Sequence, residues 1–255
     1  MLADERFEKI LDLLNSHGFC SSQSLSAQLD VSDMTIRRDL SLLDKQGKIK
    51  RVHGGARILR RLDNSAQLRA QVNTPFKQAI AEAAADFVQD GETIFIDAGS
   101  TMLELAHALR ARQFNQLRVV TNAVAISAAL SSDNITVVQL GGEIYRSTGA
   151  VVGQQAQRLL EASRFERCFI AAAAFNEDFG ISDKHLPEIE IKRTALQHSS
   201  WTALCVDSSK WNQQSMLRIA AVRDIQCVIT DSHLPQSARD YLEQRGLQTV
   251  LAEPL

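Results

Sequence analysis

The stretch Asp97-Ala-Gly-Ser-Thr101 combines residue types that bind a small anion. Gly99 would let backbone N–H groups come close to a ligand, and the hydroxyls of Ser100 and Thr101 can donate hydrogen bonds. A predicted helix follows directly, and its N-terminal dipole favours a negative group. The stretch is not a P-loop, because it has no Gly-Lys-Ser/Thr, and it is not a dinucleotide fingerprint either. It predicts a seat for a phosphate or a similar anion.

Polar or glycine residues also follow three further predicted strands and occupy one predicted helix. These residues are Asn122, Gly141, Gly142, Glu143, Glu188, Lys192, Asp207, Ser209 and Lys210. Ligands of parallel α/β sheets bind beyond the carboxyl ends of the strands, so we take these residues, with Asp97, as candidates for an effector site. Any one of them alone is more commonly a helix cap or a surface residue. Their recurrence at four strand ends favours the ligand site.

A second chemically distinctive stretch is basic. Residues 37–61 hold nine Lys or Arg against Asp39 and Asp44, a local net charge of +7 in a chain whose formal net charge is −2. Such a stripe on one module of an acidic chain is typical of contact with a phosphate backbone. An amphipathic helix with solvated arginines is the alternative, and it would suffice for two arginines alone.

The spacing of apolar residues predicts a recognition helix in this stretch. Ser32 can cap its start and Gly47 its end, and Ile36, Leu40 and Leu43 form one buried stripe. We expect Arg38 and Met34 to contact base edges, Arg37 and Thr35 to position the helix, and Asp39 to make a structural ion pair or cap. The full set of DNA-binding candidates is Ser32, Met34, Thr35, Arg37, Arg38, Ser41, Lys45, Lys48, Lys50, Arg51 and His53.

The surrounding elements predict a winged helix-turn-helix over residues 1–59. A first helix at 4–16 carries an apolar stripe, and Ser21 or Ser22 caps a short second helix. After the recognition helix the period changes to two, and a His-Gly-Gly turn predicts a small hairpin, the wing. The wing's Lys48, Lys50 and Arg51 would add backbone or minor-groove contacts.

The remainder of the chain predicts a linker over 60–76 and an α/β domain over 77–255. Residues 63–255 carry 17 Lys or Arg and 22 Asp or Glu, so this half is not expected to bind nucleic acid. Apolar strands alternate with helices, which predicts a mostly parallel sheet covered on both faces. The predicted strands are 93–97, 117–121, 135–140, 168–173, 202–206, 226–230 and 248–251, and the predicted helices are 77–89, 102–111, 123–130, 154–162, 188–198 and 236–244.

Composition indicates a soluble, cytoplasmic protein. The chain has four widely spaced cysteines without a C-x-x-C, which we expect to be reduced and buried. We expect no signal peptide at the start Met-Leu-Ala-Asp-Glu-Arg, and because no 18-residue apolar run is present we expect no membrane span. The six histidines lack ligand spacing. We therefore expect no metal and no cofactor.

Both halves of the chain resemble the DeoR family of bacterial transcriptional regulators. The residues that match the family's DNA-binding signature are Arg6, Ile10, Leu14, Ser32, Thr35, Ile36, Arg37, Arg38, Asp39, Leu40, Gly47, Arg51, His53, Gly54, Gly55 and Ala56. The residues that match its sensor domain are Asp97, Gly99, Ser100, Thr101, Thr121, Asn122, Gly141, Gly142, Glu143, Asp207, Ser209 and Lys210. The sequence departs from the family pattern at Trp211, at 171–175 and at Pro75-Phe76, which bear on pocket shape and linker geometry.

The resemblance implies a homo-oligomeric repressor, a dimer or tetramer, of a carbohydrate-use operon. Its sensor domain would be related in fold to ribose-5-phosphate isomerase and the coenzyme A transferases, and a phosphorylated sugar or sugar alcohol would control it. The Asp97 loop is then the phosphate seat, and Asp207, Ser209 and Lys210 contact sugar hydroxyls or phosphate. The alternative is a sugar-phosphate isomerase-like enzyme with Asp97, Glu188, Asp207 and Lys210 as acids and bases. No spacing demands catalysis, so no catalytic residue is assigned.

Overall fold

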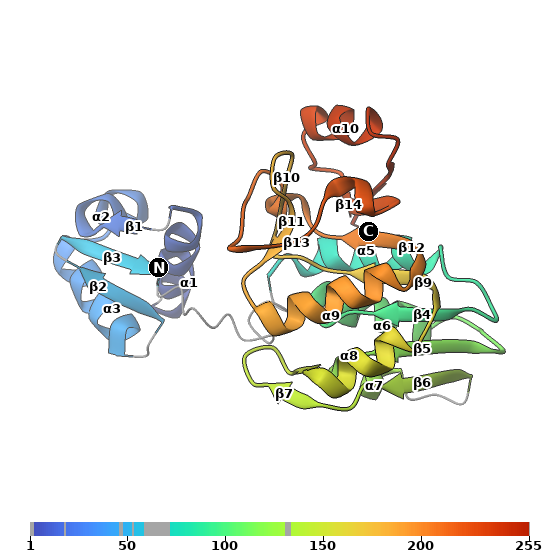
Figure 1. Ribbon diagram of the computed structural model, residues 1–255. Helices are drawn as coiled ribbons and strands as arrows, with labels where there is room; N and C mark the ends of the chain where they lie inside the picture. The colour runs from blue at the N-terminus through green and yellow to red at the C-terminus, as the bar shows by residue number, and fades with distance from the viewer. Residues whose placement is uncertain are drawn as a thin grey trace. The chain divides into compact units, whose positions relative to one another are not determined.

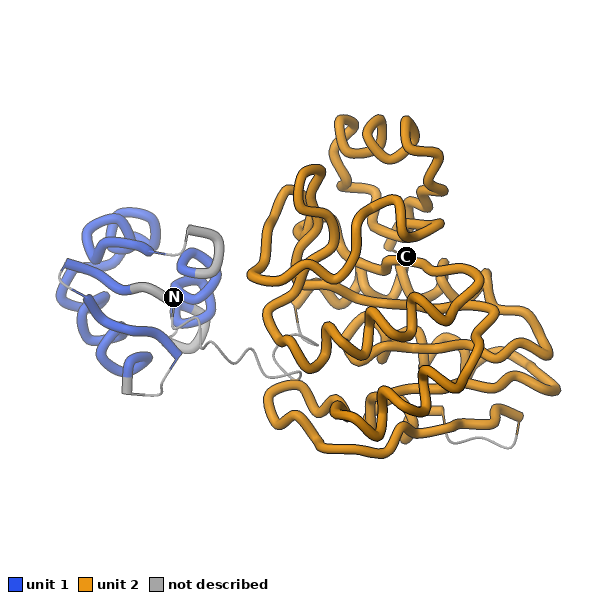
Figure 2. The backbone as a smooth tube through the Cα atoms, in the orientation of Figure 1, with its two compact units in different colours: residues 1–64 blue, residues 65–255 orange. Residues whose placement is uncertain are grey.

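The computed structural model of the chain describes residues 3–17, 19–45, 48–52, 54–58, 72–130 and 134–254. The chain forms two compact units, Met1–Asn64 and Ser65–Leu255 (Figure 2). Each unit has its own hydrophobic core. The predicted domain boundary after residue 59, the predicted helix end at Gly47 and most of the predicted linker lie outside the described residues.

The described residues of the first unit form three helices and a three-stranded antiparallel sheet of order β1-β3-β2. Its elements are α1 (Ala3–His17), β1 (Phe19–Ser21), α2 (Ser22–Leu29), α3 (Asp33–Lys45), β2 (Ile49–Val52) and β3 (Gly55–Ile58). The predicted three helices and hairpin are confirmed. Strand β1 was not predicted, because three residues are too few to show a period of two.

Local sequence explains how these helices begin, end and pack. The Ser21 side chain caps α2 by accepting the N–H of Ser24 at 3.1 Å, and Asp30 ends the helix in the left-handed conformation with φ 51°. Ile36, Leu40 and Leu43 of α3 are buried as predicted. Truncating Leu40 to alanine would leave a cavity, which costs about 2–5 kcal/mol in such cores.

Glycine is required at position 55, where β3 pairs with β1. A Cβ on Gly55 would lie 2.2 Å from the carbonyl oxygen of Cys20, so no side chain fits there. Gly54 has φ +80° in the turn before it. The Gly-Gly pair therefore does more than close the hairpin, since it brings the wing against the third strand of the sheet.

The second unit is an α/β domain around a seven-stranded parallel sheet. The strands of this sheet are β4 (Thr93–Ile96), β5 (Leu117–Thr121), β6 (Ile135–Gln139), β9 (Phe165–Ile170), β12 (Ser199–Cys205), β14 (Cys227–Asp231) and β15 (Gln248–Ala252). The helices are α5 (Thr74–Ala85), α6 (Ser100–Arg110), α7 (Val124–Ala129), α8 (Gln154–Glu161), α9 (Leu186–Gln197) and α10 (Gln236–Glu243), with 3₁₀ turns η1 (Ser208–Lys210) and η2 (Val222–Asp224).

The order of the sheet is β15-β14-β12-β9-β4-β5-β6, so the chain moves outward from β4 in one direction and then from β9 in the other. The crossovers are right-handed in such sheets, which places the helices of the two halves on opposite faces. Helices α8 and α9 lie on one side of the sheet and α5 and α6 on the other (Figure 1). The predicted mostly parallel, two-faced architecture is confirmed.

Several predicted boundaries shift, and five short strands were not predicted. Helix α5 begins at Thr74 rather than at residue 77, because Pro75 is well suited to a first helical turn, and it ends at Ala85. Strand β9 begins at Phe165 rather than at residue 168. The unpredicted strands are the hairpin β7 (Glu143–Tyr145) and β8 (Ala150–Val152) and the antiparallel sheet of β10 (Ala174–Asn176), β11 (Gly180–Asp183) and β13 (Leu217–Ala220).

Candidate functional site

Helix α3 begins at the predicted cap. The hydroxyl oxygen of Ser32 accepts the N–H of Thr35 at 3.2 Å, and the two hydroxyls lie 2.8 Å apart. This satisfies one of the N–H groups that a helix start leaves unpaired. With the apolar stripe turned inward, Met34 is 79 % exposed, and Arg37 and Arg38 are exposed.

The structure brings part of the basic wing next to this helix. Arg37 of α3 and Arg51 of β2 line one hollow of about 300 Å³ in the first unit. Lys48 and Lys50 are exposed, whereas Thr35 and Ser41 are partly exposed. The side chain of Lys45, and His53 as a whole, lie outside the described residues. A phosphate in the hollow would meet two guanidinium groups from different elements.

Two ion pairs in this unit differ in their surroundings. Arg37 pairs with Asp33 at 2.7 Å on the exposed surface of α3, and hydrogen bonds from Ser22 and from Arg37 lower the pKa of Asp33. Asp39 is buried and pairs with Arg6 of α1 at 2.5 Å. Asp39 is thus a structural partner, as predicted, and it ties α3 to α1.

In the second unit, Asp97 follows β4 at the point where the sheet changes direction. Its backbone N–H donates to Phe169 of β9 at 3.0 Å, and its Oδ2 accepts the N–H of Ala171 at 3.3 Å. The carboxylate is fully buried. Such a switch point is where parallel α/β sheets bind ligands.

Lys192 of α9 reaches the same point from the layer above the sheet. Its ammonium lies 3.3 Å from Asp97 Oδ2 and 2.9 Å from Asp183 Oδ2, and it donates to the carbonyl of Ala171 at 2.8 Å. Glu188, one turn earlier on α9, is also buried. The predicted residues Asp97, Glu188 and Lys192 therefore come together, and Asp183 joins them. We call these four residues the switch-point cluster.

Burial and charge perturb the switch-point cluster. Burial raises the pKa of Asp97 to about 7, although Lys192 opposes this effect. Burial alone would lower the pKa of Lys192, but Asp183, Asp97 and Glu188 raise it above its usual value. The ammonium is therefore fixed in its charged form by carboxylates of the protein.

A hairpin covers the start of α9 beside this cluster. Thr148, in the turn between β7 and β8, donates to Glu188 Oε1 at 2.9 Å. The Tyr145 hydroxyl lies 3.1 Å from Nδ1 of His185, which precedes α9. Sequence reasoning missed Tyr145, Thr148, Asp183 and His185, because nothing local marks an isolated Tyr, Thr, Asp or His as part of a site.

The predicted anion seat lies at the N-terminus of α6. Gly99 precedes this 11-residue helix, and a Cβ on Gly99 would lie 3.3 Å from the Cβ of Ala171. Ser100 is half-buried and Thr101 is buried. Free backbone N–H groups in the first turn and two hydroxyls suit an anionic oxygen.

The remaining predicted effector residues occupy other positions along the carboxyl edge. Asn122 follows β5, is fully buried, and donates to the carbonyl of Val151 in β8 at 3.4 Å. Gly141, Gly142 and Glu143 are exposed where the chain enters β7. Asp207 follows β12 and takes hydrogen bonds from Asn73 and from Ser209. Ser209 is exposed and Lys210 is half-buried in η1.

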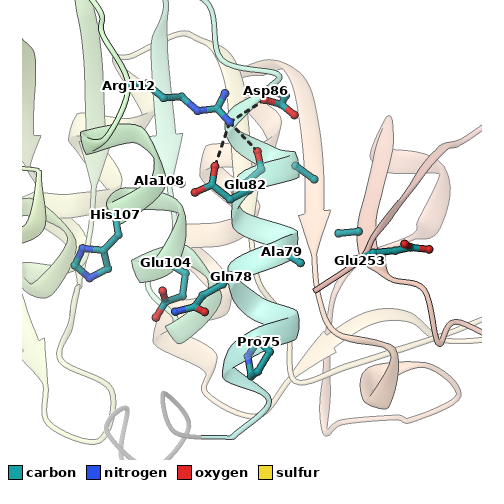
Figure 3. Close-up of a pocket in the computed structure, with 12 residues that line it drawn as sticks. Pro75, Gln78, Ala79, Glu82, Asp86, Glu104, His107, Ala108, Arg112 and Glu253 are labelled. Atoms are coloured by element: carbon teal, nitrogen blue, oxygen red, sulfur yellow. Dashed lines mark hydrogen bonds and ion pairs between the residues drawn. The ribbon is translucent and has the colours of Figure 1, made fainter. Parts of the chain in front are cut away.

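A groove of about 780 Å³ lies elsewhere, between α5, α6 and the end of β15 (Figure 3). Its Arg112 already pairs with Asp86 at 2.8 Å and with Glu82 at 3.3 Å. Glu104 and Glu253 add further carboxylates. This acidic lining does not suit a phosphate, and the groove contains none of the predicted effector residues. The switch point therefore stays the candidate ligand site.

Comparison with known families is decisive. Residues 6–61 match the DeoR-like helix-turn-helix domain, and residues 72–232 match the DeoR C terminal sensor domain. The lactose phosphotransferase system repressor of Lactococcus lactis is 36 % identical over 243 residues, which cover 92 % of this chain and 94 % of that protein. The chain belongs to the DeoR family.

Other DeoR-family relatives align over nearly their full length. The glycerol-3-phosphate regulon repressor of Haemophilus influenzae is 31 % identical over 96 % of both chains. The putative aga operon transcriptional repressor of Escherichia coli O157:H7 is 29 % identical over 97 % of this chain and 93 % of that one. Among solved structures, ribose 5 phosphate isomerase A from Neisseria gonorrhoeae aligns with a TM-score of 0.41 and 21 % identity, covering 54 % and 53 % of the two chains.

The predicted family is thereby confirmed, and the chain is a DeoR-family DNA-binding transcriptional regulator; its relatives are described as regulators, not enzymes. Within the described residues, no helix has the length and apolar character needed to cross a bilayer. The four cysteines are free and buried, as predicted.

Proposed function

We propose that this DeoR-family regulator represses a carbohydrate-use operon and that a phosphorylated sugar or sugar alcohol controls its DNA binding. The observation that carries the proposal is the switch-point cluster beside the anion seat at α6. It provides hydrogen-bonding groups for a polyol next to a seat for its phosphate. The relatives that repress lactose, aga and glycerol-3-phosphate genes support the carbohydrate link.

In the DNA-binding unit, α3 is the recognition helix. Arg38 and Met34 face outward to read base edges in the major groove, and Arg37 with Arg51 grips a phosphate in the hollow between helix and wing. Lys48 and Lys50 add backbone contacts. Two copies of the chain reading two half-sites would supply the affinity that one small unit lacks.

In the sensor unit, the phosphate lies against Gly99, Ser100 and Thr101 at the start of α6, and the carbon chain extends toward Asp97 and Glu188. Asn122, Gly141, Gly142, Glu143, Lys192, Asp207, Ser209 and Lys210 complete the candidate site. A phosphate that carries about two negative charges gains from the helix N-terminus and the hydroxyls. The same contacts would be absent for the unphosphorylated parent sugar.

A thermal-shift screen against sugar phosphates, sugar-alcohol phosphates and their unphosphorylated parents tests this function. A ligand at 100 times its dissociation constant adds about 2.7 kcal/mol to the free energy of unfolding. We expect one phosphate ester to raise the melting temperature while its parent does not. Ser100→Ala and Lys210→Ala should each reduce the shift, whereas Ser127→Ala, a hydroxyl change on α7 away from the proposed seat, should not. A shift with inorganic phosphate alone, or with none of the esters, would refute the proposal.

A further inference from the structure

The ammonium of Lys192 is already fully engaged by the protein. An ammonium has three N–H donors, and Lys192 meets three acceptors: the carbonyl of Ala171 and one oxygen each of Asp97 and Asp183. The Lys192 residue is only 2 % exposed. It therefore cannot pair with an anionic ligand without giving up one of its own carboxylates.

Two buried side-chain oxygens without a hydrogen-bond partner follow β4 and β5. Oδ1 of Asp97 and Oδ1 of Asn122 are both buried without a partner, and both side chains have no exposed surface. The amide of Asn122 cannot be flipped to present a donor instead, because its nitrogen faces the carbonyl of Val151. Both oxygens can thus accept a hydrogen bond from a ligand when Asp97 is ionised.

These two acceptors directly follow two neighbouring strands, β4 and β5. Ile96 of β4 pairs with Thr121 of β5, so Asp97 and Asn122 are the next residues of two parallel strands in register. Side chains at equivalent positions of such strands project from the same face of the sheet. Asp97 meets α9 there through Lys192, Asn122 meets β8 through Val151, and α9 contacts β8. Both side chains therefore lie between the sheet and the layer that α9 and β8 form.

The charge of the switch-point cluster is also negative. Asp97, Asp183 and Glu188 outnumber Lys192 by two when all four groups are ionised, and by one when Asp97 holds a proton. A ligand carboxylate brought beside them would meet like charges at low dielectric. A metal ion does not account for the acceptors, because the described residues contain no group of three or more His, Cys, Asp or Glu placed to hold one.

We infer that the end of the effector facing Asp97 and Asn122 must donate hydrogen bonds and carry no negative charge, so the site selects phosphates of neutral or amino sugars and rejects phosphates of sugar acids. This inference rests on the proposed sugar-phosphate site and adds its selectivity. Asp183 is a positioning residue in it. By holding the ammonium of Lys192, Asp183 prevents Lys192 from neutralising an acidic ligand.

Calorimetry with matched ligands tests the selectivity. The probes are the 6-phosphates of glucose, galactose and mannose, each with its 2-amino-2-deoxy analogue and its aldonate, so that the phosphate stays constant while the other end changes. For the sugar configuration that binds, we expect the neutral or amino compound to bind at least about tenfold more tightly than the aldonate. Equal or tighter binding of the aldonate would overturn the inference and leave the proposed function standing. Absence of binding by every phosphate, those of the thermal-shift screen included, would overturn both.

Asp183→Asn provides a second readout that a loss of stability cannot imitate. The amide keeps an acceptor for Lys192 but removes one negative charge, so the ratio of aldonate to neutral-sugar dissociation constants should fall by about tenfold. Asp97→Asn should also lower the ratio of aldonate to neutral-sugar dissociation constants. It should weaken binding of the amino sugar more than binding of the other two compounds. Asp178→Asn, an exposed change in the turn between β10 and β11, is the matched control and should leave the ratio unchanged. An unchanged ratio in Asp183→Asn would overturn the role of Asp183.

Discussion

The side-chain amide of Asn73 donates to Oδ1 of Asp207 at 3.2 Å, across 134 positions of sequence. Asn73 directly precedes α5, the first helix of the sensor unit, and Asp207 begins the loop that carries Ser209 and Lys210. One hydrogen bond therefore links the residue before the first helix of the sensor unit to a loop of the candidate effector site.

Asn73 has φ 56°, so its replacement separates hydrogen bonding from backbone strain. Asn73→Ala should lower the free energy of unfolding by about 0.5–1.5 kcal/mol through the lost hydrogen bond. The strain of alanine in the left-handed backbone conformation should lower it by about 1 kcal/mol more. Asn73→Gly loses the hydrogen bond and costs extra chain entropy, but it avoids the left-handed strain, so it should be the more stable variant by less than about 1 kcal/mol. Urea unfolding followed by the fluorescence of Trp201 and Trp211, both in the sensor unit, measures the difference. Equal stability of the two variants would contradict this assignment of the strain.

The buried pair of Arg6 and Asp39 should matter for the fold of the DNA-binding unit. Asp39→Asn removes a charged hydrogen bond between two largely buried side chains, which costs about 1.5–3 kcal/mol. Hydrogen exchange of α1 and α3 in the full chain should accelerate at least about tenfold. Asp33→Asn breaks the exposed pair with Arg37 instead and should change exchange little. If the two variants behave alike, the buried pair has no special role.

Arg38 and Lys48 should affect DNA binding in different ways. Arg38→Ala should cost about 1–3 kcal/mol of binding free energy and relax the preference at one base pair. Lys48→Ala should weaken all DNA sequences alike and lower the salt slope by about one. Fluorescence anisotropy with a selected operator, its single-base variants and unrelated DNA measures both effects. Identical profiles for the two variants would refute the division into base and phosphate contacts.

Asp97 should make the stability of the sensor unit depend on pH. Burial raises the pKa of Asp97 to about 7, so between pH ~4 and ~7 the folded chain holds a proton that the unfolded chain has released. The contribution of Asp97 to stability is therefore lost as the pH rises through this window. Between pH 5 and pH 8, the free energy of unfolding of Asp97→Asn should rise by at least about 1 kcal/mol relative to that of the wild type, as measured by urea unfolding. A constant difference between the two proteins would show that Asp97 keeps an ordinary pKa.

The sequence predicts those elements that repeat a period over many residues. The stripe of Ile36, Leu40 and Leu43 and the apolar strand Leu117–Thr121 each carry their own signal, and both were predicted at the right place. Strand β1 and the hairpin β7–β8 have strands of three residues, and their formation depends on pairing with partners that local sequence does not reveal.

The candidate site divides along the same line. Asp97 and Lys192 could be predicted as members, since each has a recognisable position at a strand end or on a helix. Asp183 could not, because its proximity to Lys192 and Asp97 depends on the small antiparallel sheet that ends at Asp183. Nor does the sequence reveal that neighbouring carboxylates compensate the positive charge of Lys192. Because of them, Lys192 is an internal counter-ion rather than an anchor for a ligand.

The affinity of the full chain for its selected operator, with and without the sugar phosphate found by thermal shift, tests the proposed regulation most directly. A ligand can change DNA binding only if it prefers one of two states of the protein. We expect saturating phosphate ester to change the dissociation constant for operator DNA at least about tenfold, a coupling of about 1.4 kcal/mol, while the unphosphorylated parent has no effect. An operator affinity that stays constant when the sensor site is saturated would contradict control of DNA binding by a sugar phosphate.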